Sequence, residues 1–322
     1  MDELLVATLV ASTLRVATPL ILCALAGVVC ERAGVIDLGL EGKMLATAFT
    51  TAAVGAATGS FVLALAAALA VGIALSMLHG YACVTHRGDQ VVMGMAITMT
   101  AAGLTVVLGS AWFAQGGQTP PLPESVRLHP ILAGAGAAIA ALPLIGPAIG
   151  IGLLGHNIFV YGTLGLVALV WWALFRTRFG LRLRATGENP AMVDAAGVSV
   201  PLARYRALAV NGVLAALAGS YLVLALNPSF IPHMTAGRGY IALAAMIFGK
   251  WHPVGALAAC LLFGFLEALA IRMQGAVLPG IGEVPVQAIQ ALPYVMTVVL
   301  LAGFIGRAYA PKDLGLPYLK ER

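Results

Sequence analysis

The sequence predicts an all-α fold: a polytopic transmembrane helical bundle of about nine segments, with the N-terminus outside and the C-terminus cytoplasmic. Hydrophobic residues make up 61% of the 322 positions, and charged residues make up only 10%. Soluble domains usually carry about 25% charged residues, so this chain has too few to cover a water-facing surface. The apolar residues also occur in runs of about 20, the length that crosses a bilayer as a helix.

The apolar segments follow one another along a single transmembrane domain that spans residues 1–322. Their expected ranges are 4–29, 36–57, 60–84, 90–113, 157–176, 204–226, 238–249, 253–273 and 287–306. The seventh, 238–249, has about 12 apolar-rich residues, fewer than a straight crossing needs. We therefore expect a re-entrant or broken helix there, with protein or a cavity shielding its ends.

Two long connections separate these segments. Residues 114–156 are rich in proline and glycine and contain a weakly apolar piece, which is expected to form a short surface or re-entrant helix. Residues 177–203 form the one long polar and basic loop. The two connections are expected on opposite sides of the membrane.

The distribution of lysine and arginine predicts the orientation. With the N-terminus outside, 13 of the 18 basic residues fall on the cytoplasmic side and only three fall outside. Such an excess of cytoplasmic basic residues is the normal signature of membrane topology. The loop 177–203 is then cytoplasmic and the loop 114–156 is periplasmic. The cytoplasmic residues are Arg32, Arg87, Arg176, Arg178, Arg182, Arg184, Arg204, Arg206, Lys250, Arg307, Lys312, Lys320 and Arg322.

No pattern of catalytic residues stands out in the sequence. The stretch Gly39-Leu-Glu-Gly-Lys-Met44 lacks the spacing and the Ser/Thr of a nucleotide-binding loop. Neither HExxH nor GxSxG occurs, and the six histidines are scattered. We therefore expect no enzyme activity, no metal and no cofactor. The net charge of +5 is gathered in short loops, which does not indicate a nucleic-acid partner.

The most informative stretch lies inside the basic loop. Gly187-Glu-Asn-Pro190 predicts a turn that leads into a helix, because proline is favoured in the first helical turn. Small, helix-compatible residues continue to 196, and Gly197 can end the helix. The result is a short helix at the membrane surface between two transmembrane helices. The alternative is a solvated basic loop that serves only topology.

Three segments of the sequence resemble one transporter family. Gly187-Glu-Asn-Pro-Ala-x-x-x-Ala-Ala-Gly197-Val resembles the coupling-helix motif of ABC importer permeases of the branched-chain amino acid, ribose and nucleoside class. The stretch from Glu31 to Gly42 is similar to a pattern that opens an early helix in these permeases. The segments 235–240 and 248–255 resemble their late glycine-rich region, although Gly249-Lys250 stands where a glycine pair is usual. The form of the early pattern looks like the shorter permease of bacterial nucleoside importers.

The resemblance implies a permease subunit that carries nucleosides by alternating access, driven by a separate ATPase. It implies three kinds of partner: cytosolic ATP-binding subunits, a second permease that is a paralogue of this chain, and a periplasmic or lipid-anchored substrate-binding protein. The location implied is the bacterial inner membrane. The residues implied to couple the chain to the ATPase are Arg184, Gly187, Glu188, Asn189, Pro190, Ala195 and Gly197.

Polar residues inside the apolar segments are the candidates for the substrate path, because they are costly in a membrane. Asp37 and Glu41 are four apart and are expected to share a helix face, unless Asp37 caps the helix start. Asn211 and Asn227 are expected either to bind a base or ribose, or to bridge neighbouring helices. The full candidate set is Asp37, Glu41, Asn211, Asn227, Phe230 and Glu267.

Three other functions remain open from the sequence. The same permease role for a simple sugar such as ribose is the first alternative. An ion-driven secondary transporter would need inverted repeats, and no convincing internal repeat is visible. A membrane enzyme would need paired carboxylates or a histidine cluster at one membrane depth, which the sequence does not offer.

Overall fold

The computed structural model describes residues 2–140, 146–274, 277–278, 282–283, 291, 295 and 309–320. Six helices in this part of the chain are long and apolar enough to cross a membrane. They include α1 (Asp2–Glu31), α4 (Gln90–Phe113) and α7 (Ile158–Arg176). The other three are α3 (Phe61–Gly80) and α10 (Val200–Tyr221), each prolonged by one π-helical turn, and α12 (Pro253–Met273). The prediction of a multi-pass helical protein is confirmed.

Two further helices occupy the remaining expected segments within the described residues. Helix α2 (Leu40–Thr58) follows the turn after α1, and α11 (Arg238–Phe248) is short. The short length predicted for the seventh segment is therefore confirmed. The ninth segment, 287–306, falls almost wholly outside the described residues, so the count of nine stays a prediction. A two-residue antiparallel pair joins β1 (Val277–Leu278) to β2 (Gly282–Glu283).

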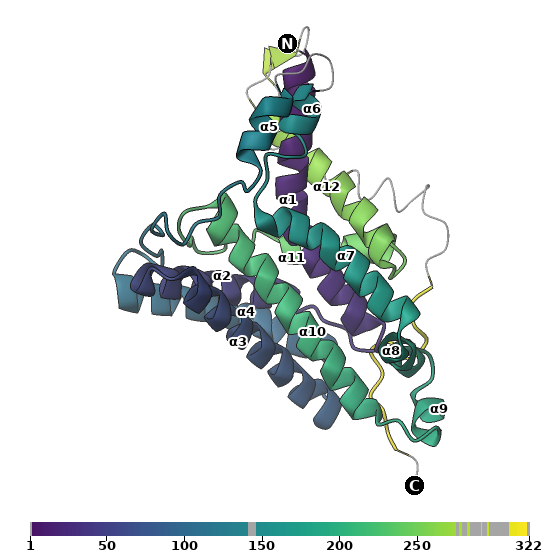
Figure 1. Cartoon of the computed structure of the whole chain (residues 1–322). Coiled ribbons are helices and arrows are strands. Elements are labelled where there is room, and N and C mark those ends of the chain that lie inside the picture. Colours follow the sequence, from purple (N-terminus) through teal and green to yellow (C-terminus); the bar gives the residue numbers. More distant parts are fainter. Residues whose placement is uncertain are drawn as a thin grey trace.

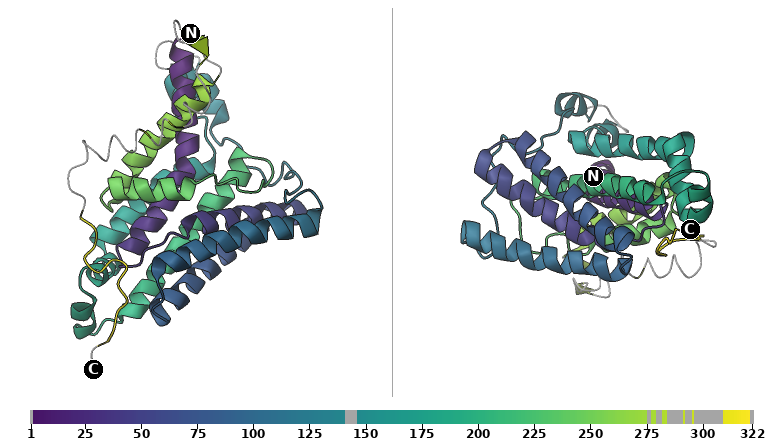
Figure 2. Two further views of the ribbon diagram at one scale, coloured as in Figure 1. Left: turned by 180° about the vertical axis from the view of Figure 1, so that it is seen from behind. Right: turned by 90° about the horizontal axis from the view of Figure 1, so that it is seen from below.

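Helices α1 and α10 form the centre of the molecule. Helix α1 packs against α12, α10 and α11, and α10 packs against α3 and α2. Most of both central helices is buried, whereas α3 and α4 are largely exposed. Helices α2, α3 and α4 form a layer that diverges from α1, as both side views show (Figure 1, Figure 2). The exposed apolar faces of this layer are those expected next to lipid or another permease subunit.

Small residues let the central helices approach closely. A Cβ on Gly212 of α10 would lie 2.6 Å from the carbonyl oxygen of Gly72 in α3. A Cβ on Gly219 of α10 would collide with the backbone of Met44 in α2. Close contact between backbones is how helices associate in a bilayer, where burial against lipid gives little driving force. The glycines of α10 therefore fix the position of α2 and α3.

The 114–156 connection contains two short helices. They are α5 (Ala133–Ala140) and α6 (Gly146–Gly150), which pack on each other. Helix α6 also contacts α1, and both lie at the N-terminal end of α1 (Figure 1). The expected short helix is thus present as a pair.

The 177–203 loop is more helical than the sequence suggested. Helix α8 (Arg178–Glu188) precedes α9 (Pro190–Ala195), whereas we expected only the second. The hydroxyl of Thr177 caps α8 by accepting a hydrogen bond from the Gly180 amide. Gly180 reads as a helix breaker in sequence, but here it lets α8 touch the carbonyl groups at the end of α7. Both helices lie at the end of the molecule opposite the N-terminus, close to the C-terminus (Figure 1).

Candidate functional site

Helix α9 has the local structure that its sequence predicts. The side chain of Asn189 caps it by accepting a hydrogen bond from the Met192 amide at 3.1 Å. Pro190 occupies the first turn, where its missing amide hydrogen costs nothing. Gly197 has a φ of 77°, a left-handed conformation that favours glycine and ends the helix. The turn, the helix and its end are therefore confirmed as structure, and their coupling role stays a prediction.

The candidate coupling residues divide into an exposed and a buried group. Glu188, Asn189, Ala195 and Gly197 are exposed at the tip of the loop. Their neighbour Met192 is 70% exposed, which is unusual for a large apolar side chain next to polar residues. An exposed apolar tip of this kind suits contact with another protein.

Gly187 and Arg184 hold the loop to the rest of the chain. A Cβ on Gly187 would collide with the carbonyl oxygen of Arg32, just after α1. The Arg184 guanidinium donates to the Leu174 carbonyl at 3.0 Å and lies 4.7 Å from the centre of the Phe175 ring. Arg184 therefore fastens α8 onto α7, and its coupling role stays a prediction.

The C-terminal residues 309–320 complete this end of the molecule, and no sequence pattern predicted their position. The Asp313 amide donates to the Gly187 carbonyl at 2.9 Å, and the Gly315 amide donates to the Gly34 carbonyl at 3.1 Å. The guanidinium of Arg204 on α10 forms an ion pair with the Asp313 carboxylate at 2.8 Å. The tail thus contacts both the 177–203 loop and the turn between α1 and α2.

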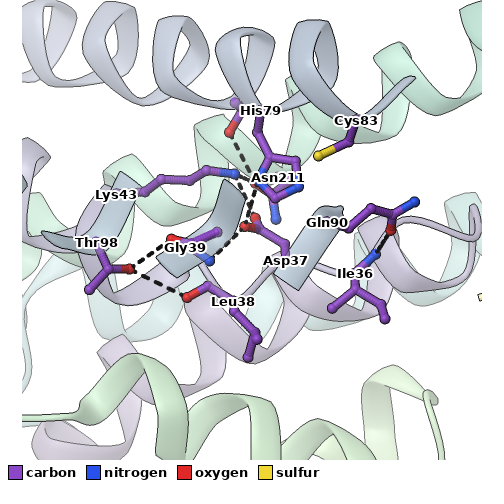
Figure 3. A network of polar contacts seen from close by, with 12 residues as sticks. Ile36, Asp37, Leu38, Gly39, Lys43, His79, Cys83, Gln90, Thr98 and Asn211 are labelled. Atoms are coloured by element: carbon purple, nitrogen blue, oxygen red, sulfur yellow. Dashed lines mark hydrogen bonds and ion pairs between the residues drawn. The ribbon is translucent and has the colours of Figure 1, made fainter. Parts of the chain in front are cut away.

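A buried polar cluster lies where α2 and α3 meet α10 (Figure 3). The Lys43 ammonium contacts the Asp37 carboxylate at 2.6 Å and the Asn211 amide oxygen at 3.0 Å. Ser76 also donates to Asn211 at 3.0 Å, and Nδ1 of His79 lies 3.4 Å from Asp37. All five side chains are completely buried, so ion pairs and hydrogen bonds must replace the lost water.

This cluster joins four elements that are distant in sequence. Asp37 comes from the turn before α2, Lys43 from α2, His79 from α3 and Asn211 from α10. The Asn211 amide also donates to the Ala26 carbonyl of α1 at 3.1 Å. Asn211 therefore bridges helices, the second of the two roles that its sequence position left open.

Glu41 has a different set of partners. Its carboxylate is buried and accepts hydrogen bonds from the amides of Gly237 at 2.8 Å and Gly239 at 2.6 Å. These amides lie at the start of α11, where backbone N–H groups lack partners within the helix. Asp37 lies before the first residue of α2 and binds Lys43 instead. The expectation that Asp37 and Glu41 share a helix face is therefore wrong, because the turn at Gly39 separates them.

The remaining path candidates lie outside the buried cluster. Glu267 on α12 forms an ion pair with Arg238 at the start of α11, at 2.9 Å. Asn227 ends the π-helical turn after α10. Phe230 is completely buried and makes an edge contact with Phe49, with ring centres 5.2 Å apart.

Phe49 also borders an apolar cavity of about 420 Å³ between α2, α3 and α4. Its ring stacks on Trp112 of α4, with centres 5.9 Å apart. Sequence reasoning missed both residues, because single aromatic residues in apolar helices give no signal of a cavity. The structure thus places Phe230 next to a cavity and engages Asp37, Glu41, Asn211 and Glu267 in contacts within the chain.

The six long apolar helices of the described residues define a multi-pass membrane protein. A family model described as "Branched-chain amino acid transport system / permease component" matches residues 9–303. The chain belongs to this permease family, as the resemblance implied.

Several relatives are similar over nearly the whole chain. The guanosine ABC transporter permease protein NupQ of Bacillus subtilis is 37% identical, over 98% of this chain and 97% of its own length. The nucleoside ABC transporter permease protein NupC of Lactococcus lactis is 36% identical over the same shares. TsgC13 of Haloferax volcanii, described provisionally as a glucose ABC transporter permease, is 37% identical over 83% of this chain and 78% of its own length.

Proposed function

We propose that this chain is the membrane-spanning permease subunit of an ABC importer for nucleosides. The similarity to NupQ and NupC over nearly their whole lengths is the observation that carries the proposal. The proposal places the chain in the bacterial inner membrane, beside a paralogous permease and a substrate-binding protein. ATP is hydrolysed by separate cytosolic subunits that dock on α9, and the N-terminus lies outside.

The hydrogen bonds at the start of α11 favour an uncharged substrate. The N-terminus of a broken helix inside a membrane is a ready site for an anionic group, such as an amino-acid carboxylate. In this chain the Glu41 carboxylate already accepts the amides of Gly237 and Gly239 there. A nucleoside or a sugar needs no such anion site, whereas an amino acid would compete with Glu41. This occupation therefore favours nucleosides over amino acids within the family.

We propose that the substrate path runs along the part of the α2–α4 layer that carries aromatic side chains. Phe49, Trp112 and Phe230 form one aromatic cluster, and Phe49 and Trp112 border the apolar cavity. Aromatic rings can stack favourably on any nucleobase, because every base has a π-face. The roles of Asn227 and Glu267 in the path stay predictions.

Uptake in a deletion strain that carries the transporter genes on a plasmid tests the substrate. Radiolabelled guanosine should accumulate, and unlabelled nucleosides should compete with it while ribose and glucose do not. Competition by the sugars alone would replace the nucleoside proposal with the sugar alternative, which the description of TsgC13 favours.

A second experiment tests the coupling role of α9. Deletion of 188–196, or Gly197→Pro at a φ of 77° that proline cannot adopt, should abolish uptake while the protein still inserts. ATP hydrolysis by the cytosolic subunits should then no longer drive uptake. Normal uptake by either variant would contradict the assignment.

A further inference from the structure

The C-terminal residues 309–320 lie against the coupling loop rather than extending freely into the cytoplasm. Backbone hydrogen bonds tie Asp313 to Gly187 and Gly315 to Gly34. The approach is close, because a Cβ on Gly34 would lie 3.2 Å from the Asp313 carbonyl oxygen and 3.4 Å from Gly187. The tail therefore shares one packed junction with the coupling loop and the α1–α2 turn.

A buried ion pair anchors the tail at this junction. The Arg204 side chain is only 1% exposed, and its two terminal nitrogens bind the Asp313 carboxylate at 2.8 Å and the Leu316 carbonyl at 3.0 Å. An arginine that has lost its water needs such acceptors, so the tail stabilises Arg204 as much as Arg204 holds the tail. Because of this ion pair, residues 309–320 are packed against the protein and are not merely a solvent-exposed terminus.

Between the tail and α9 lies a cleft of about 570 Å³. One wall is formed by the coupling segment, including Pro190 and Ala195, and the other by the tail, including Pro317 and Leu319. Large apolar side chains are exposed on both elements, since Met192 is 70% and Leu319 is 59% exposed. Leu319 lines the cleft, whereas Met192 lies on α9 outside its lining. Two exposed apolar side chains on neighbouring elements suit a surface that another protein covers.

We propose that residues 309–320 form the second wall of the ATPase docking surface, with α9 as the first wall and the Arg204–Asp313 ion pair as its anchor. The inference rests on the proposed function and extends it, because the coupling helix alone would present only half of the cleft. The occupant is a segment of the cytosolic ATP-binding subunit that contacts both walls at once. Arg204 and Asp313 act as positioning residues, and Leu319 contacts the partner directly.

The experiment compares four variants of the full transporter, solubilised from membranes and purified through a tag on the permease. Asp313→Asn removes the charge of the anchor, and Leu319→Ser changes the exposed wall without touching the anchor. Deletion of 188–196 removes the first wall. Glu124→Gln, which removes a carboxylate from an exposed ion pair in the 114–156 connection, is the matched control.

The readouts are the amount of ATP-binding subunit retained and the number of nucleosides transported per ATP hydrolysed. We expect about a tenfold loss of retention for Asp313→Asn and about a fivefold loss for Leu319→Ser, as for residues at the centre of an interface. Glu124→Gln should behave as the unmodified protein. Because Leu319 is exposed, its variant tests the inference even if Asp313→Asn fails to fold.

The outcomes separate the inference from the proposed function. Loss of the ATP-binding subunit in the deletion variant together with the tail variants supports both. Loss in the deletion variant alone overturns the second wall and leaves the proposed function standing. Full retention in all variants overturns the proposed function, and the inference with it.

Discussion

Removal of Lys43 should destabilise the protein far more than removal of Lys43 together with Asp37. The two side chains form an ion pair at 2.6 Å and are completely buried. Lys43→Met leaves the Asp37 carboxylate without its ammonium partner, and the neutral groups that remain near it are the Gly39 amide at 3.0 Å, the ring of His79 and the Asn211 side chain. Breaking a buried pair by removing one partner typically costs about 3–5 kcal/mol.

The double variant Lys43→Met/Asp37→Asn should recover most of this loss. The asparagine oxygen can still accept the Gly39 amide, and no buried charge remains. Replacing both members of a buried pair is often neutral, so we expect a residual cost of about 1 kcal/mol from the lost contact with Asn211. Asp37→Asn alone leaves the Lys43 ammonium unpaired and should resemble Lys43→Met.

Thermal unfolding in detergent, followed by the loss of monodisperse protein in size-exclusion chromatography, measures these differences. The order expected is unmodified protein, then the double variant, then the two single variants. Thr58→Val, which removes a hydroxyl from the exposed end of α2, is the control and should unfold near the unmodified protein. If Lys43→Met were as stable as the double variant, the cluster would not hold a charged pair and the reasoning would be refuted.

Three further changes test other contacts of the fold. Gly187→Ala should lower transport at unchanged ATP hydrolysis, because the added Cβ would collide with the α1–α2 turn. Overpacking of this kind typically costs about 1–3 kcal/mol. The control Gly162→Ala adds a Cβ in open space and should have no effect on uptake. Glu41→Gln should lower the unfolding temperature, since a neutral amide can accept only one of the two α11 amides, and hydrogen bonds to charged groups contribute about 1.5–3 kcal/mol. Burial lowers the pKa of His156, so the unfolded chain binds its proton more readily and stability should fall as the pH drops below about 6.5. In His156→Gln, the unfolding temperature should depend less on pH in this range, and an unchanged dependence would contradict this assignment.

Several elements were predictable from the sequence because local chemistry marks their ends. Helix α4 begins and ends where expected, since Asp89 caps it by accepting the amides of Val91 and Val92. Helix α12 also has the expected bounds, with Pro253 in its first turn. The end of α9 at Gly197 follows from the same kind of signal. Each of these signals acts within a few residues, so one sequence suffices to read it.

The features that sequence reasoning missed depend on partners that are distant in the chain. The sequence around Gly187 predicts a turn. The structure shows that glycine is needed there because its backbone contacts the segment after α1, more than 150 residues earlier. Arg204 was counted only as a cytoplasmic charge, whereas it is buried by the tail. Helix α8 was missed because Gly180 fits tertiary packing rather than helix propensity. No local pattern contains this information.

The contacts of the α1–α2 turn connect the coupling surface to the membrane helices. Through Gly34, this turn touches Gly187 and the tail. A few residues later, Asp37 enters the buried cluster with Lys43 and Asn211, and Glu41 binds the start of α11. Close backbone packing at Gly187 leaves no room for α9 to move independently, because packed interfaces change between discrete arrangements rather than deform continuously. A displacement of α9 by the ATPase must therefore either break this junction or shift the turn and the helices fastened to it.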